Sequence, residues 1–391
     1  MRLSPHLARR AVDIEPFRVM AILAQARVLE AQGRDIVHME IGEPDFPTPA
    51  PIVAAGGGAL QAGYTHYTPA LGLPQLRAAI AAFYATRYGV TLAPNRVVVT
   101  PGASGALLLA LAALLNPGDE VLLADPGYPC NRHFVRFLEG RAVALPVDAA
   151  TQFQPTAAQI AAHWSPATRA VLLATPANPT GTLLPPDTLR EIQHTVAARG
   201  GALIVDEIYH GLTYGCQAAT ALALSDDVFV INSFSKYFGM TGWRLGWLIA
   251  PEAYIEPLDR LAQNIFLASS TPAQYAALAA FQPDTLALLE ARRAEFGRRR
   301  DFLLPALREL GFDLPTTPEG AFYLYAGCER FGLSSEDLAQ VLLNEAGVAI
   351  TPGTDFGRHQ ADTHVRFAYT TSLDRLEQGV ARLAAFLPRF A

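Results

Sequence analysis

The chain has 391 residues, of which 51% are hydrophobic and 17% are charged, so it is long enough to bury a large core in about two domains. A formal net charge of -6 excludes the basic surface that a nucleic-acid-binding protein presents. The start of the chain lacks the apolar core of a signal peptide, and no apolar run is long enough to span a bilayer. We therefore expect a cytoplasmic protein without nucleic-acid or membrane partners.

The predicted elements start with a helix over roughly residues 16–32 and the apolar segment IVHMEIG, residues 36–42. Between about residues 95 and 250, short β-branched runs alternate with helical stretches: RVVVT, EVLLA, RAVALPV, RAVLLAT, ALIVDE, DVFVINS and RLGWLIA. This alternation predicts an α/β fold with a mostly parallel seven-stranded sheet sandwiched by helices. A long charged helix from about residue 284 to 310 then leads into short strands and helices, which predicts a smaller α+β domain.

The change of pattern after Pro283 suggests where the domains divide. We predict a large domain over residues 47–285 and a small domain formed by residues 14–46 together with residues 286–391. Residues 1–13 are predicted to form an N-terminal arm. The three cysteines are widely spaced and the nine histidines form no HxxxH or HExxH pair, so the sequence indicates neither a disulfide framework nor a metal site.

Five polar loops follow directly on predicted strands: TPGASG, DPGYP, TPANPTG, DEIY and SFSK. In open α/β sheets, ligands bind beyond the carboxyl ends of the strands. We therefore expect the five loops to converge on one site.

Lys236, in the last of these loops, is the only lysine among the 30 lysine and arginine residues of the chain. Arginine replaces lysine readily in surface ion pairs and in most phosphate contacts. It cannot form an imine, because that bond needs a primary amine that loses its proton, and a guanidinium group keeps its proton. Lys236 is thus the candidate for a covalent bond to an aldehyde, against the alternative of a leftover surface lysine in a composition-biased chain.

Two segments near Lys236 favour a bound phosphate. The strand, glycine turn and helix around TPGASG place backbone amides at a helix N-terminus, which is an anion site, although many such turns serve packing only. A guanidinium group eight residues after Lys236 would bind the phosphate beside two serine hydroxyls. The predicted phosphate contacts are Ala103, Ser104, Gly105, Ser233, Ser235 and Arg244. An aldehyde and a phosphate together predict pyridoxal 5'-phosphate as the cofactor.

The remaining loops place side chains around the cofactor ring. Asp206 ends an apolar strand, where its carboxylate needs a cation, and a protonated pyridine nitrogen supplies one and makes the ring an electron sink. Tyr209 and Asn178 would bond the 3-oxygen of the ring, and Tyr128 would stack on its face. The alternatives are that Asp206 caps the following helix and that Tyr128 only packs in its turn.

Across its length, the chain resembles the class I/II aminotransferases, within the fold-type-I pyridoxal-phosphate enzymes. The stretch SFSKYFGMTGWRLGW is similar to the lysine signature of that family, with the spacing of serine, lysine and arginine intact. Other blocks resemble the family in order: IGEPDFPTP, YTPALGLPQLRAAIA, PANPTGT, DEIY, PEGAFYLY, ITPGTDFG and VRFAY. The resemblance covers about residues 14–385 and implies an aspartate-aminotransferase-like fold.

The resemblance also implies roles for the matched positions. Lys236 would hold the cofactor as a Schiff base and then carry the proton between substrate Cα and cofactor C4′, with Asp206 and Tyr209 as catalytic neighbours. The phosphate and ring contacts would be those given above. Tyr67 would reach the phosphate bound in the neighbouring subunit, so a homodimer with shared active sites is implied.

For the substrate, the resemblance implies that Arg366 binds the α-carboxylate, helped by Asn178 and the backbone at Gly42. From the residues alone, a structural ion pair is the simpler role for Arg366. No second arginine is assigned by spacing to a side-chain carboxylate. Arg132, in PCNRHF, is a candidate, with a charge on a surface helix as the favoured alternative.

The implied reaction is a ping-pong transamination between an L-amino acid and a 2-oxo acid, with 2-oxoglutarate as the expected acceptor. A carbon-sulfur β-lyase on the same scaffold is the alternative that the sequence leaves open. A cofactor-binding regulator is disfavoured, because such relatives carry an appended helix-turn-helix module and only about thirteen residues precede the matching region.

Overall fold

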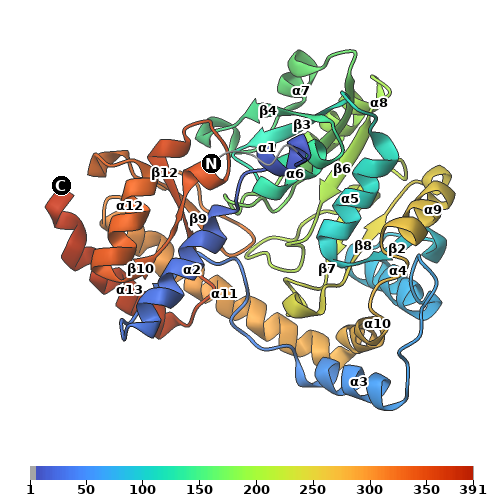
Figure 1. Cartoon of the computed structure of the whole chain (residues 1–391), viewed down its shortest axis with the longest axis horizontal. Helices are drawn as coiled ribbons and strands as arrows, with labels where there is room; N and C mark the ends of the chain where they lie inside the picture. Colours follow the sequence, from blue (N-terminus) through green and yellow to red (C-terminus); the bar gives the residue numbers. More distant parts are fainter. Residues whose placement is uncertain (1–5, 391) are drawn as a thin grey trace.

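The computed structural model describes residues 6–390. Its centre is a seven-stranded sheet in the order β2-β8-β7-β6-β5-β3-β4, with helices against both faces (Figure 1). Neighbouring strands are parallel except at β8, which runs antiparallel to β2 and to β7. The strands are β2 (Val97–Thr100), β3 (Glu120–Asp125), β4 (Arg141–Pro146), β5 (Thr168–Ala174), β6 (Ala202–Asp206), β7 (Phe229–Ser233) and β8 (Gly246–Ile249). The predicted α/β fold with a mostly parallel seven-stranded sheet is confirmed.

Successive residues of a strand face opposite sides of this sheet, so one strand contributes to two hydrophobic cores. Val97 and Val99 belong to one core, and Val98 between them belongs to the other. Helices α4, α8 and α11 supply the first core, and α5, α6 and α9 supply the second. They span α4 (Pro74–Tyr88), α5 (Gly102–Leu114), α6 (Pro129–Phe137), α8 (Pro186–Ala197), α9 (Ile255–Ile265) and α11 (Pro283–Glu309). Burial on both faces explains why these strands read as continuous apolar runs.

Two smaller sheets lie at the far end of α11, on the left in Figure 1. One is antiparallel, in the order β11-β12-β9, and the other pairs β1 with β10 in parallel. Val37 of β1 pairs with Val348 of β10, so the early segment IVHMEIG joins the C-terminal part of the chain. The elements are β1 (Val37–His38), β9 (Tyr323–Gly327), β10 (Val348–Ala349), β11 (Thr351–Pro352), β12 (His364–Ala368), α2 (Arg18–Ala31), α12 (Ser335–Val341) and α13 (Leu373–Phe386). The limits of the two domains stay a prediction.

The N-terminal segment lies next to α6, one of the helices that cover the large sheet (Figure 1). Of the predicted arm, residues 1–5 lie outside the described residues, and α1 (Arg9–Asp13) packs beside α6, where Arg136 donates to the Asp13 carboxylate at 3.1 Å. The remaining helices are α3 (Ala50–Gln61), α7 (Ala157–His163) and α10 (Thr271–Leu278). Over residues 6–390, none of the helices combines the length and the apolar character that crossing a membrane requires.

Candidate active site

Lys236 lies three residues after the end of β7, and its side chain reaches the segment after β1. Its Nζ donates a hydrogen bond to the Gly42 carbonyl at 2.6 Å and lies 6.0 Å from the ring centre of Tyr209. Burial lowers the pKa of Lys236 to about 8, and the positive charges of Arg366 and Arg244 act in the same direction. The amine is therefore partly neutral near physiological pH, as a nucleophile must be.

Asp206 is the last residue of β6 and its side chain is 5% exposed. Within the described residues, its carboxylate accepts one hydrogen bond, from the Ile208 amide at 3.1 Å, and forms no ion pair. Burial raises the pKa of Asp206 to about 7. The alternative role as a helix cap is wrong, because a turn follows β6 and the next helical turn starts only at Ala221. A buried carboxylate without a cation favours a site for a cationic ligand group.

Tyr209 and Asn178 lie on two different loops, and Tyr323 of β9 contacts Tyr209. The hydroxyl groups of Tyr209 and Tyr323 are hydrogen-bonded at 2.8 Å. A Cβ atom at position 42 would lie 2.0 Å from the Tyr323 hydroxyl, so only glycine fits at Gly42. Tyr323 is a site residue that the sequence reasoning did not assign, although it lies in the motif PEGAFYLY.

Arg366 of β12 is 2% exposed and forms no ion pair with any of residues 6–390. One guanidinium nitrogen donates to Asn178 Oδ1 at 2.9 Å, another donates to the Glu40 carbonyl at 2.5 Å, and Nε has no partner. The group lies between the rings of Tyr323 and Phe356, at 4.2 and 4.7 Å. The ion-pair alternative for Arg366 is therefore wrong. A buried guanidinium group without an anion is suited to bind a ligand carboxylate.

The backbone segment that accepts hydrogen bonds from Arg366 and Lys236 is held by a charge pair between a partly exposed histidine and a buried glutamate. His38 bonds the carboxylate of Glu40 at 2.7 Å, and Glu40 is fully buried. This hydrogen bond is the main reason why the pKa of His38 rises to about 9, so His38 is a cation at neutral pH. Thr351 adds a hydrogen bond to the Glu40 carbonyl at 3.0 Å. His38 and Glu40 thus keep two backbone acceptors in place, and sequence reasoning missed both residues.

The predicted phosphate residues lie together at the start of α5. Gly102 has a positive φ of 71°, and a Cβ there would lie 2.6 Å from the Arg244 guanidinium group. Arg244 donates to the Thr241 carbonyl at 3.0 Å and forms no ion pair with any described residue. The hydroxyls of Ser233 and Ser235 are bonded to each other at 3.0 Å. The residues of the first helical turn are Ala103, Ser104 and Gly105. Free helix amides beside an unpaired guanidinium group make an anion site.

A cavity of about 690 Å³ is lined by Tyr128, Asn178, Arg132 and Phe356, among others, and Asn178 connects it to Arg366 through their hydrogen bond. Burial raises the pKa of the Tyr128 phenol well above its usual value, and the charge of Asp206 contributes. Tyr67 does not line this cavity, and its side chain is 83% exposed. The structure therefore places Tyr128 and Arg132 at the cavity and leaves Tyr67 outside it.

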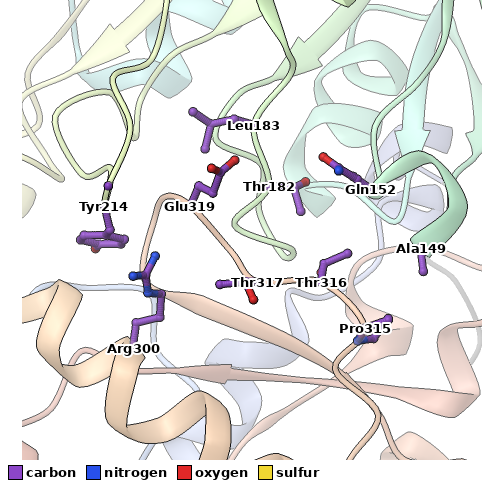
Figure 2. Close-up of a pocket in the computed structure, with 11 residues that line it drawn as sticks. Ala149, Gln152, Thr182, Leu183, Tyr214, Arg300, Pro315, Thr316, Thr317 and Glu319 are labelled. Atoms are coloured by element: carbon purple, nitrogen blue, oxygen red, sulfur yellow. The ribbon is translucent and has the colours of Figure 1, made fainter.

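A second cavity, of about 580 Å³, is lined by none of the predicted site residues. Figure 2 shows its wall, with Arg300 and Glu319 on one side and Gln152 and Thr182 on the other. Arg300 is tied there to the Pro318 carbonyl at 2.9 Å and lies over the ring of Tyr214. The candidate site is thus the first cavity and the loops around Lys236.

Known proteins match this chain over nearly its whole length. The family model for aminotransferase class I and II matches residues 34–383. A valine-pyruvate aminotransferase from Mycobacterium tuberculosis is 39% identical, covering 99% of this chain and all of that protein. An aminotransferase crystal structure from the same organism has a TM-score of 0.95 at 38% identity, covering 99% of this chain and 100% of the other. Aspartate aminotransferase from Thermus thermophilus with maleate has a TM-score of 0.92 at 33% identity, covering 98% and 100%.

These matches and the site agree. The family model covers well over half of the chain, and the three similar proteins named above are all aminotransferases. Such enzymes use pyridoxal 5'-phosphate, and the chain offers a buried amine, an uncompensated carboxylate and an anion site together. The chain belongs to the class I and II aminotransferase family of pyridoxal-phosphate-dependent transaminases.

Proposed function

We propose that this transaminase moves an amino group from an L-amino acid to a 2-oxo acid by a ping-pong mechanism through Lys236, with 2-oxoglutarate as an acceptor. Pyridoxal phosphate, when bound, supplies the electron sink for the electrons of the substrate Cα–H bond. The chain supplies attachment, orientation and proton transfer. The observation that carries this proposal is the partly neutral amine of Lys236, with its pKa of about 8, on one of the five loops that follow strands β2, β3, β5, β6 and β7. We also propose a cytoplasmic location.

The unpaired charges of the site match the charges of the cofactor and substrate. Asp206 lacks a cation and would pair with the pyridinium nitrogen, and Arg244 lacks an anion and would bind the phosphate with the first turn of α5. Tyr209 and Asn178 would bond the 3-oxygen, and Tyr128 would stack on the ring. Each charge that is unfavourable in the chain alone becomes paired when the ligands bind.

Lys236 would attach the cofactor and then serve as the proton carrier. Once a substrate amine has taken its place, the free amine of Lys236 would accept the proton from the substrate Cα and carry it for the later reprotonation. A base works best when its pKa lies near the working pH, and burial brings the pKa of Lys236 to about 8. The Gly42 carbonyl, 2.6 Å away, orients the amine.

Arg366 would hold the substrate α-carboxylate with Asn178. Replacing Arg366 with glutamine is expected to raise KM for the amino donor by about 30- to 300-fold, because a buried charge pair is lost at a cost of about 2 to 3.4 kcal/mol. Steady-state kinetics at several donor concentrations measures this change. The absorbance of the bound cofactor should be unchanged in Arg366→Gln. Arg366→Lys should recover part of the affinity for the donor, because lysine keeps the charge but not the bidentate geometry. An unchanged KM contradicts the role.

The substrate pair is tested by supplying one amino acid at a time with 2-oxoglutarate and measuring glutamate. Valine and aspartate are the first donors to try, because similar proteins are named for valine and pyruvate or for aspartate. Glutamate production supports the proposal. Pyruvate and ammonia formed without glutamate would instead support the β-lyase alternative.

We further propose a homodimer in which Tyr67 reaches the phosphate in the partner subunit. Tyr67, Ile265 and Leu267 are large and exposed, and their segments are joined by a hydrogen bond from Thr271 to the His66 carbonyl at 2.7 Å. Such a patch favours an interface with a second copy. Sedimentation should give twice the chain mass.

Removing the Tyr67 hydroxyl, as Tyr67→Phe, is expected to weaken cofactor binding by about tenfold, because one hydrogen bond to a charged phosphate is lost. Titration of the apoprotein with cofactor measures the dissociation constant. Tyr64→Phe is the matched control, since Tyr64 stacks on Tyr275 with ring centres 4.5 Å apart. Equal affinities for both variants would refute the role of Tyr67.

A further inference from the structure

Arg132 on α6 projects into the cavity that begins at Tyr128 and Asn178. One guanidinium nitrogen donates to the Asp355 carbonyl at 3.1 Å. Its only ion-pair partner within the described residues is Glu15, at 3.6 Å, and the Glu15 side chain is 56% exposed. An exposed pair at this separation is weak. Arg132 is therefore a cation that is held in place but poorly neutralised.

Arg132 is linked to Arg366 through Asp355 and Phe356. Burial raises the pKa of the Asp355 carboxyl, and the positive charges of Arg366 and Arg132 partly offset this rise. Both guanidinium groups therefore lie near that carboxyl. Phe356, the next residue, covers Arg366 at 4.7 Å and lines the cavity. A molecule whose α-carboxylate lies on Arg366 would thus extend along this wall toward Arg132.

Glu15 is held near Arg132 by its flanks. On one side, Asp13 is bound to Arg136 of α6. On the other side, the amides of Arg18 and Val19 donate to the Asp355 carboxylate at 2.9 and 3.4 Å. The short segment between these anchors crosses the cavity, which Asp13, Glu15 and Arg18 line. Glu15 itself makes no other hydrogen bond with the described residues, so its side chain is free to leave Arg132.

We infer that Arg132 binds the distal carboxylate of a dicarboxylic substrate and that Glu15 occupies Arg132 as a stand-in carboxylate when the substrate side chain is uncharged. The inference rests on the transaminase function proposed above. A ping-pong enzyme must admit two side chains in turn to one cavity, and an unpaired arginine would disfavour an apolar one. A substrate carboxylate makes two charge-assisted hydrogen bonds to a guanidinium group, so it displaces the weaker Glu15 contact.

The test compares two acceptors, 2-oxoglutarate and pyruvate, with enzyme that already carries the amino group. The measured quantity is the ratio of kcat/KM for the two acceptors. Arg132→Gln should lower this ratio about 20-fold, because only the dicarboxylate loses a charged partner. Glu15→Gln should raise the ratio about threefold, because it removes the competing carboxylate.

Two arginines that line the same cavity serve as controls. Arg136 pairs with Asp13 on the same N-terminal segment, and Arg358 has a free guanidinium group within the described residues. Arg358→Gln should leave the ratio within twofold of the parent value, and Arg136→Gln, which loosens the segment that holds Glu15, should not lower the ratio. An equal fall in Arg136→Gln would mean that anchoring the segment matters, and an equal fall in Arg358→Gln would assign the carboxylate to Arg358. Either result overturns the inference.

Calorimetry with glutarate, an unreactive dicarboxylate, gives a readout that is independent of turnover. Glutarate should bind the cofactor-loaded enzyme at least tenfold more weakly after Arg132→Gln. Butyrate, which has a single carboxylate, should bind the parent and the variant with equal affinity. Normal transamination with unchanged glutarate binding overturns the inference about Arg132 alone. Absence of amino transfer to either acceptor overturns the proposed function, and the glutarate comparison then still decides the role of Arg132.

Discussion

Replacing Lys236 with arginine is expected to abolish transamination, with kcat lowered by at least about 10,000-fold. Arginine keeps the charge and much of the length but has no amine that loses its proton, so it can neither attach the cofactor nor carry the Cα proton. Turnover of an amino acid with 2-oxoglutarate measures the loss of transamination. The pyridoxyl absorbance that stays with the protein after borohydride reduction and dialysis measures the covalent attachment of the cofactor.

The pH dependence of cofactor attachment gives an independent check on Lys236. Only the neutral amine reacts, and the pKa of Lys236 is lowered to about 8. The attachment rate of added cofactor to the apoprotein should therefore rise about tenfold per pH unit below pH 8 and level off above it. A rate that rises on to pH 10 would mean an exposed lysine of ordinary pKa. An arginine variant that keeps the absorbance or the turnover would contradict the account of the site.

Lys236 and Asp206 could be predicted from the sequence because their chemistry restricts both residue type and position. Lysine is the only side chain that forms an imine with an aldehyde. A carboxylate at the end of a buried strand needs a cation nearby, and this need follows from the local sequence alone. The seven strands were predictable for a similar reason, because burial on both faces leaves continuous apolar runs. Local sequence carries this information.

Tyr323 and Glu40 could not be predicted, because their contributions depend on contacts between distant parts of the chain. Tyr323 reaches Tyr209 and Gly42 only after β9 is placed beside the large sheet. Glu40 supplies a backbone carbonyl to Arg366, and every residue type has one. The lack of an ion-pair partner for Arg366 could not be predicted either, because it becomes visible only when the positions of all neighbouring residues are known.

Replacing Asp206 with asparagine is expected to lower kcat by about 1,000-fold while the cofactor stays attached to Lys236. Asparagine fills the same volume and accepts the Ile208 hydrogen bond, but it carries no charge to keep the ring nitrogen protonated. In comparable sites, removing one buried group that stabilises the charge developing during the reaction lowers kcat by about 100- to 1,000-fold. Single-turnover measurement of the first half-reaction gives the rate of proton removal without product release.

Glu207, the next residue, is the matched control for Asp206. It is fully buried, and its carboxylate accepts from the Thr220 hydroxyl at 3.0 Å and from the Ala221 amide at 2.7 Å. Glu207→Gln should lower the melting temperature, because a buried network is disturbed, and should change kcat by less than about threefold. Equal losses of kcat in both variants would show that any change at this strand end disturbs the site. A kcat for Asp206→Asn within tenfold of the parent would show that the ring nitrogen does not depend on this carboxylate.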